Sequence, residues 1–147
     1  MNPDVQVVEV AARHTLVVCA RTTWPELPAI WPELSQEVWG SLRAGGVRAG
    51  CPNVMLYLDD VPNIEVGVVS SEAVSLAGAV RRSALPGGRV ATATHRGGYA
   101  GLSHTHEAVL AWCREHGHEP TGTRWELYGP HRDDPDEVWV EVSWLLA

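Results

Sequence analysis

Two stretches of the chain share a pattern of residues, and this repeat limits the folds that the sequence can adopt. Leu56-Tyr57 is followed by Ile64-Glu65-Val66, and Leu127-Tyr128 is followed by Val140-Glu141-Val142. In each stretch β-prone residues flank a polar turn, a pattern that predicts a β-hairpin. A hairpin pattern that occurs twice indicates that one structural unit has been duplicated.

The first repeat, about residues 5–72, begins with β-prone residues at 5–10 and 15–21, which form one long strand or two short ones. A helix should follow, with Trp31 on its buried stripe and Trp39 at the border of that stripe, about 80° away around the axis. Because Pro28 and Pro32 lack an amide donor, we expect regular helix only from about residue 32 to residue 44.

The second repeat, about residues 78–147, follows the same order. β-prone residues at 79–83 and 89–96 precede a helix expected over about residues 99–116, and the second hairpin completes the unit. Both units read as strand, helix, strand, strand. The sequence therefore predicts one α+β domain over residues 1–147, with a single antiparallel sheet and two main helices on one face.

Bulk properties exclude several classes of function. The net charge of −7 comes from 11 basic and 18 acidic residues, so direct binding to nucleic acid is not expected. Cys19, Cys51 and Cys113 are too far apart for a disulfide framework or a zinc knuckle, and we interpret them as reduced thiols. With no signal segment and no apolar run of membrane length, we expect a cytoplasmic protein that does not bind a membrane.

Glu126 is the side chain that the repeat does not explain. On a strand, Glu126 and Tyr128 share one face, and Met55 occupies the position of Glu126 in the first repeat. A buried carboxylate without a partner is costly, so this face is either exposed to solvent or forms a pocket that suits a flat, cationic guest. Seven tryptophans and three tyrosines keep an aromatic-lined site open as a hypothesis.

Metal chemistry finds little support in the sequence. His104 and His106 are two residues apart on a helix, about 200° around its axis, and cannot chelate one ion together. His116 and His118 lack a third ligand nearby. We expect His106, on the apolar stripe of the second helix, to be a half-buried residue with satisfied hydrogen bonds, and we predict neither a metal nor a cofactor.

Four segments of the second half resemble the GyrI-like small-molecule-binding domain, the effector-binding domain of multidrug-responsive bacterial transcription regulators. They are His95 to Tyr99 with Leu102, Trp112 to Gly117, Trp125 to Tyr128, and Val140 to Val142. The duplicated architecture agrees with that family, so the resemblance covers essentially the whole chain. It implies a ligand cleft between the repeats, where flat, lipophilic and often cationic compounds bind against aromatic rings.

The resemblance also implies roles for individual residues. The family's buried glutamate would be Glu126, and Met55 would offer an adaptable apolar wall. The set of candidate ligand-binding residues is Glu126, Tyr128, Tyr57, Met55, Trp39, Trp139 and Tyr99.

The resemblance therefore predicts a binding protein for such compounds. We expect it to act as a stand-alone domain, because regulators of the family carry a DNA-binding segment before this domain and only a few residues precede the first strand here. One alternative is a hydrolase of cyclopropane-containing alkylating natural products, a reaction known for some GyrI-like proteins, with Glu126 as general acid or base. A further alternative is a gyrase-inhibitor-like adaptor that binds a protein partner through the acidic turns at 59–60 and 133–137.

Overall fold

A computed structural model describes residues 4–130 and 132–147. The first repeat contains β1 (Gln6–Val10), β2 (Arg13–Arg21), α1 (Leu27–Ala44), β3 (Asn53–Tyr57) and β4 (Asn63–Val69). The second contains β5 (Arg81–Leu85), β6 (Gly88–Arg96), α2 (Leu102–Glu115), β7 (Pro120–Tyr128) and β8 (Trp139–Leu146), with short 3-10 turns η1 (Tyr99–Gly101) and η2 (Pro135–Glu137). Across this described part of the chain, no helix has the length and apolar character needed to span a bilayer.

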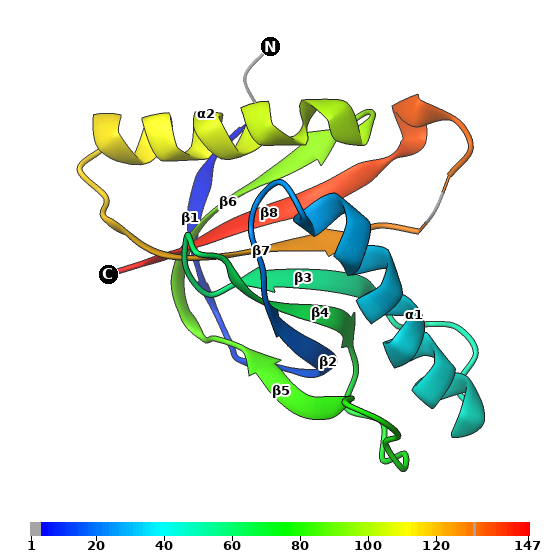
Figure 1. Ribbon diagram of the computed structural model, residues 1–147. Helices are drawn as coiled ribbons and strands as arrows, with labels where there is room; N and C mark the ends of the chain where they lie inside the picture. The colour runs from blue at the N-terminus through cyan, green and yellow to red at the C-terminus, as the bar shows by residue number, and fades with distance from the viewer. Residues whose placement is uncertain (1–3, 131) are drawn as a thin grey trace.

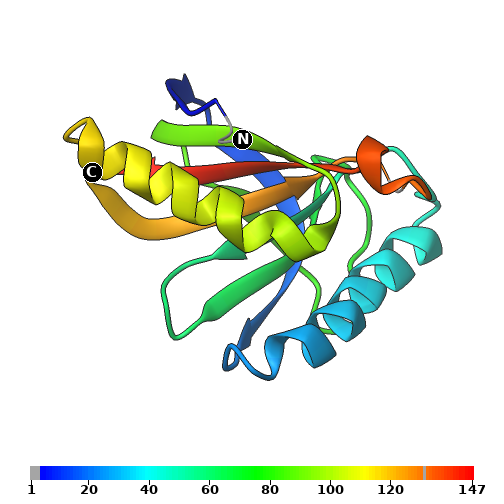
Figure 2. The same ribbon diagram turned by 90° about the horizontal axis from the view of Figure 1, so that it is seen from above.

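All eight strands belong to one antiparallel sheet, in the order β1-β6-β8-β7-β3-β4-β2-β5. Reading this order backwards exchanges every strand with its counterpart in the other repeat, so a pseudo-twofold axis passes between β7 and β3. Both helices cover the same face, with α2 against β6 and β8 and α1 against β2 and β4 (Figures 1 and 2). The α+β class and the duplication predicted from the sequence are confirmed.

The register of the hairpins agrees with the predicted alignment of the repeats. Met55 in β3 pairs with Val66, and Glu126 in β7 pairs with Val142. Met55 also pairs directly with Glu126 across the β3–β7 ladder. The two residues that correspond to each other in the repeats are thus neighbours at the axis.

Each repeat begins with two strands, which agrees with the interpretation of residues 5–21 as two short strands and with the two β-prone segments of the second repeat. The first strand of each repeat pairs with the other half. β1 pairs with β6 of the second repeat, and β5 pairs with β2 of the first. The short connections at 11–12 and 86–87 therefore link opposite edges of the sheet, which must curl. The two connections meet, because a Cβ at Gly87 would lie only 2.9 Å from the amide nitrogen of Ala12.

Helix α1 begins at Leu27, so the prediction of regular helix only from about residue 32 is wrong. Thr23 explains the early start, because its Oγ1 accepts from the Glu26 amide at 3.3 Å and its carbonyl accepts from the Leu27 amide at 3.0 Å. Pro28 lies in the first turn, where an amide proton would have no helical acceptor. Pro32 is inside the helix and removes a single backbone hydrogen bond.

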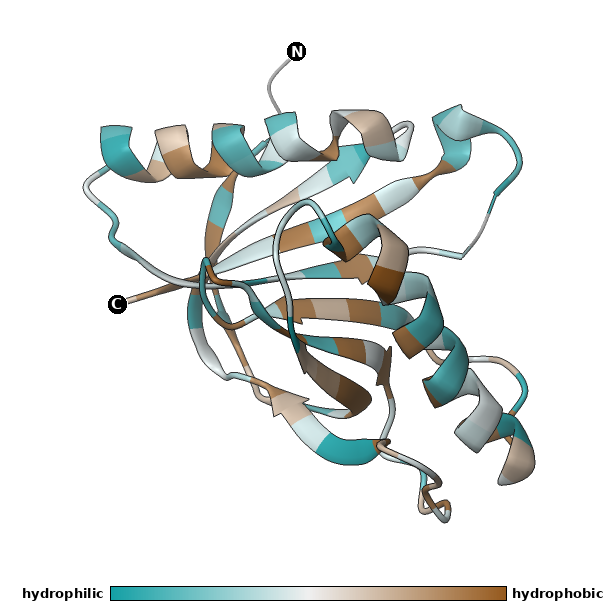
Figure 3. Ribbon diagram, viewed as in Figure 1, coloured by the Kyte–Doolittle hydropathy of each residue, from teal (hydrophilic) through white to brown (hydrophobic). Residues whose placement is uncertain are grey.

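Hydrophobic side chains fill both faces of the curled sheet. On the helical face, Val38 and Leu42 of α1 and Val109 and Cys113 of α2 are fully buried against the strands. The opposite face encloses a separate cluster, which comprises Val54, Leu56, Leu85, Val90, Trp125 and Leu127. Figure 3 shows that hydrophobic residues are frequent in the central strands and hydrophilic residues in the connection between β7 and β8.

Gly67 in β4 marks a close approach between β4 and β2. A Cβ at this position would lie 1.9 Å from the carbonyl oxygen of Leu16 and 2.8 Å from the Cα of Val17. We expect Gly67→Ala to lower the free energy of unfolding by about 1–3 kcal/mol, because the added methyl group would force backbone apart. Urea denaturation measures this change.

Gly40 in α1 provides the matched control, since it is exposed and a Cβ there would meet no atom within 4 Å. Gly40→Ala should raise the free energy of unfolding by about 0.5–1 kcal/mol, because alanine is the better helix former. A stability loss in both variants, or in neither, would contradict the close approach at Gly67.

Candidate ligand-binding site

A cavity of about 470 Å³ lies where the two repeats meet, over β3, β4 and β7 and between α1 and η1. This volume is within the range of roughly 300–1,000 Å³ that is typical of small-molecule sites. The residues that line it are Leu27, Pro28, Trp31, Ser35, Asn53, Val54, Met55, Tyr57, Val66, Gly67, Tyr99, Leu102, Glu126, Tyr128 and Gly129. Within the described part of the chain, Glu126 is the one charged side chain of this lining.

Glu126 is buried, with 4% of its surface exposed, and both of its carboxylate oxygens are hydrogen-bonded. The phenols of Tyr57 and Tyr128 donate to Oε1 at 3.2 Å and 2.5 Å. Nε2 of His106 lies 2.7 Å from Oε2. The donors come from β3, β7 and α2, so elements of both repeats hold the carboxylate in place.

The carboxylate changes the titration of the two phenols that it binds. Burial raises the pKa of Tyr57 far above the ordinary tyrosine value, and the negative charge of Glu126 raises it further. The pKa of Tyr128 is raised for the same two reasons, with burial again the larger cause. Both phenols therefore stay protonated and remain available as donors to Glu126.

Five of the seven residues predicted for the site line the cavity: Glu126, Tyr128, Tyr57, Met55 and Tyr99. Trp39 and Trp139 do not line it, but each contacts a residue that does. The indole N–H of Trp39 donates to Oδ1 of Asn53 at 2.8 Å. The indole of Trp139 lies against Gly129, where an added Cβ would come within 2.3 Å of the ring.

The prediction that Trp31 belongs to the core is wrong. Its side chain is 42% exposed and forms part of the cavity wall. Val38 and Leu42, further along the same helical stripe, face packed strands, whereas Trp31 faces the open space between α1 and η1. A helical stripe shows which residues share a face, but it does not show where that face meets a cavity.

His106 has the satisfied hydrogen bonds that were expected, but its contact with Glu126 was not foreseen. Its Nδ1 accepts a hydrogen bond from the indole N–H of Trp144 at 3.0 Å. The sequence did contain a signal for this contact, because an imidazole on the apolar stripe of α2 needs a polar partner on the strands beneath the helix.

Arg124, two residues before Glu126, occupies an aromatic cage outside the cavity lining. Its guanidinium lies 5.4 Å from the ring centre of Trp24, 5.3 Å from that of Tyr57 and 4.8 Å from that of Trp144. It also forms an ion pair with Asp60 at 2.7 Å. Tyr57 therefore contacts a fixed cation through its ring and a fixed anion through its hydroxyl group.

The sequence model of the GyrI-like small molecule binding domain family matches residues 3–146, and the chain belongs to this family. Solved structures share its fold. The C-terminal domain of EcmrR has a TM-score of 0.78 at 16% identity, over 100% of this chain and 99% of that one. SAV2435, solved bound to tetraphenylphosphonium, has a TM-score of 0.72 at 13% identity, over 98% of this chain and 94% of that one.

A hydrolase encoded by lin2189 from Listeria innocua has a TM-score of 0.66 at 10% identity, over 99% of this chain and 93% of that one. At such low identities these likenesses establish the shared fold alone. The comparison with curated proteins found no match.

The raised pKa values of Tyr57 and Tyr128 predict that the folded state loses stability at alkaline pH. Above pH of about 10 the unfolded chain releases these phenolic protons and the folded chain keeps them, so the contribution of the two phenols to stability is full below that pH and is lost above it. The loss should be about 1.4 kcal/mol per phenol one pH unit above the ordinary pKa.

Urea denaturation of wild type, Tyr57→Phe and Tyr128→Phe at several alkaline pH values measures this slope. Each variant should lose part of the pH dependence. The chain contains no lysine, a residue that would otherwise titrate in the same pH range as the phenols. Glu107→Gln, at an exposed position of α2, should leave the slope unchanged. A wild-type slope that both phenylalanine variants retain would refute the prediction.

Proposed function

We propose that this chain is a cytoplasmic binding protein for flat, lipophilic compounds that carry a positive charge. The observation that carries the proposal is the buried carboxylate of Glu126, the one charged group in the described lining of a cavity whose other walls are uncharged and mostly apolar or aromatic. A cationic guest would balance this charge in a setting where water cannot screen it well.

The uncharged walls of the cavity also suit a flat, lipophilic cation. Rings of Trp31, Tyr57, Tyr99 and Tyr128 surround the cavity, and Met55 adds a flexible apolar surface. Contact between a cation and one aromatic face contributes roughly 0.5–2 kcal/mol. Because apolar burial and ring contacts dominate over directional hydrogen bonds, we expect recognition of several related compounds. The tetraphenylphosphonium complex of SAV2435, which has the same fold, supports this ligand class.

The geometry favours an electrostatic role for Glu126 over the hydrolase alternative. A general base must accept a proton from a water molecule, and a carboxylate has about four lone-pair positions for this purpose. Tyr57, Tyr128 and His106 already engage three of them. Glu126 is therefore arranged mainly to present a fixed negative charge.

Replacing Glu126 by Gln should weaken the binding of tetraphenylphosphonium by about 10- to 100-fold, because the countercharge is lost while the shape is kept. Triphenylphosphine oxide, a neutral analogue with similar rings, should lose much less affinity. Isothermal titration calorimetry measures both ligands. Glu107→Gln, which removes one negative charge from the exposed side of α2, should bind both as wild type does. Equal losses for the two ligands would exclude Glu126 as the countercharge.

Replacing Trp31 by Ala should weaken both ligands to a similar extent, by about tenfold, because it removes an aromatic wall and no charge. The side chain is 42% exposed, so the variant should remain folded. Trp112→Ala is the control, since Trp112 stacks on His116 and His118 and does not line the cavity. Unchanged affinity in Trp31→Ala would place the ligand elsewhere.

A further inference from the structure

Asn53 is the one carboxamide in the described lining of the cavity, and one of its two polar atoms is already engaged. The indole N–H of Trp39 donates to this atom at 2.8 Å. An indole N–H can only donate, so the engaged atom is the carbonyl oxygen Oδ1 and not the amide nitrogen Nδ2. Among the described residues, Nδ2 has no hydrogen-bond partner. Its two N–H donors are therefore available to a guest in the cavity.

Helix α1 sets the orientation of this amide. Trp31, Ser35 and Trp39 follow one another at intervals of four residues, so they share one side of the helix. The first two line the cavity, and the ring of Trp39 packs against the buried cluster that includes Val38. Because the packed indole holds Oδ1 in place, the amide loses little freedom when it bonds a ligand.

Asn53 and Glu126 lie on the same face of the sheet, at separate points of the cavity floor. Asn53 precedes Met55 by two residues in β3, and Met55 pairs with Glu126 across the β3–β7 ladder. Asn53 and Glu126 are therefore diagonal neighbours, which lie about 7–8 Å apart in a sheet. One aromatic ring with its substituents can span this separation, so a single flat ligand can reach both side chains.

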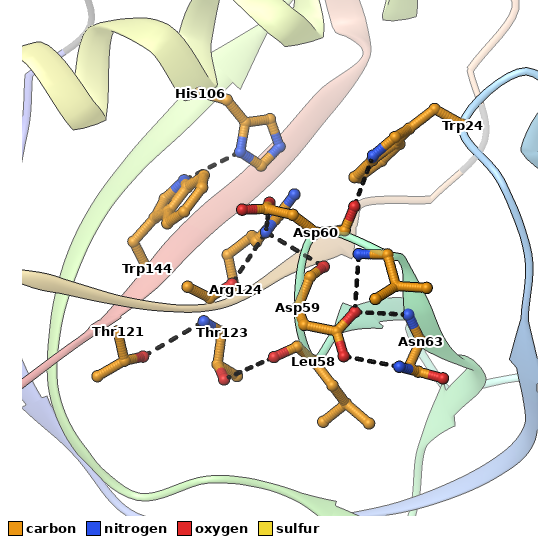
Figure 4. Close-up of polar contacts among 12 residues, drawn as sticks. Trp24, Leu58, Asp59, Asp60, Asn63, His106, Thr121, Thr123, Arg124 and Trp144 are labelled. Carbon is orange, nitrogen blue, oxygen red and sulfur yellow. Dashed lines mark hydrogen bonds and ion pairs between the residues drawn. The ribbon is translucent and has the colours of Figure 1, made fainter.

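At the other end of β3, the polar groups already bond one another. The guanidinium of Arg124 donates to Asp60 at 2.7 Å, and the indole N–H of Trp24 donates to the carbonyl oxygen of Asp60 at 3.0 Å (Figure 4). The phenol of Tyr57 donates to the buried carboxylate. Because these donors are used within the protein, the structure favours hydrogen bonding to a guest at the Asn53 end.

Two other residues of the lining, Ser35 and Tyr99, carry a hydroxyl group that has no hydrogen-bond partner among the described residues. Neither hydroxyl is held in one direction, since the serine hydroxyl can rotate and the Tyr99 side chain is 51% exposed. A donor that is already oriented loses less entropy on binding. Asn53 is therefore the best placed of the three donors to select a ligand.

We propose that the ligands of this site are lipophilic cations that also carry a hydrogen-bond acceptor, such as a carbonyl oxygen, about one aromatic ring away from the charge. Asn53 binds this acceptor through Nδ2, and Trp39 is a positioning residue that acts through Asn53. The proposal rests on the proposed function, because it names the ligand class of the same cavity. It adds a polar contact to a site whose other contacts are a charge and apolar surface.

The test uses two phosphonium ions that differ in one polar atom. (Para-acetylphenyl)triphenylphosphonium carries a ketone, and (para-isopropenylphenyl)triphenylphosphonium has a methylene group in place of the ketone oxygen, with the same charge and nearly the same shape. Isothermal titration calorimetry gives the preference for the ketone as the ratio of the two dissociation constants. Because burial of the ketone costs desolvation in every variant, the informative quantity is the change of this ratio on mutation.

Asn53→Ala should reduce the preference for the ketone by about three- to tenfold relative to wild type, the contribution of one hydrogen bond. Asn53→Asp should reduce it at least as much, because both N–H donors are lost while the oxygen that accepts from Trp39 is kept. The added charge acts on both ions and cancels in the ratio. Trp39→Phe should reduce the preference in part, because the amide is then free to turn.

Gln36→Ala is the matched control, since it removes an exposed carboxamide of α1 that does not line the cavity, and it should leave the ratio unchanged. If wild type binds both ions and the ratio is unchanged in Asn53→Ala and Asn53→Asp, the inference is overturned and the proposed function stands. A ratio that falls in Ser35→Ala or Tyr99→Phe, and not in the Asn53 variants, also overturns it. If neither ion binds wild type, the proposed function fails and this inference fails with it.

Discussion

The pairing of β3 with β7 in the middle of the sheet joins the two repeats and also forms the floor of the cavity. Its register places Met55 beside Glu126 at the pseudo-twofold axis, with Tyr57 and Tyr128 two residues further along their strands. Alternation then turns all four side chains to the face that carries the helices. Because α1 and α2 pack on opposite halves of that face, the cavity lies over the axis.

A buried carboxylate is stable only if the fold supplies its hydrogen bonds. Here two phenols and an imidazole supply them, and each donor is fixed by a further contact: Tyr57 by Arg124, Tyr128 by a T-shaped contact with the Tyr99 ring, and His106 by Trp144. The side chains that stabilise this part of the molecule are therefore the same ones that define the electrostatics of the cavity. Stability and the charge distribution of the cavity depend on one network.

Much of the fold could be predicted from the sequence, because its strongest signal is local and repeated. The Leu-Tyr pattern of the two hairpins predicted the duplication and the correspondence of residues between the repeats, and the exception to that pattern, Glu126 in the position of Met55, pointed to the candidate site. The start of α1 was placed too late because Pro28 and Pro32 were given more weight than a threonine cap, whereas Thr23 does bond the first turn and Pro28 lies where no amide donor is needed.

The remaining parts of the site depend on tertiary contacts. Trp31 and His106 each lie on a helical stripe that periodicity describes correctly, but the stripe does not show which strand residue or which open space lies opposite. The contact of His106 with Glu126 joins residues 20 positions apart, and its contact with Trp144 spans 38 positions. Such pairs follow from the packing of α2 on the sheet, against β6 and β8, which no single segment encodes.

The pseudo-twofold axis limits which charged residues can lie at the centre of this sheet. In a dimer of two identical half-length chains, any residue beside the axis would face its own copy, and two carboxylates directly opposite each other would destabilise the strands. Joining both halves in one polypeptide removes that constraint. The thioether of Met55 can then lie where the second acid would have been, so that Glu126 has an uncharged partner across the β3–β7 ladder.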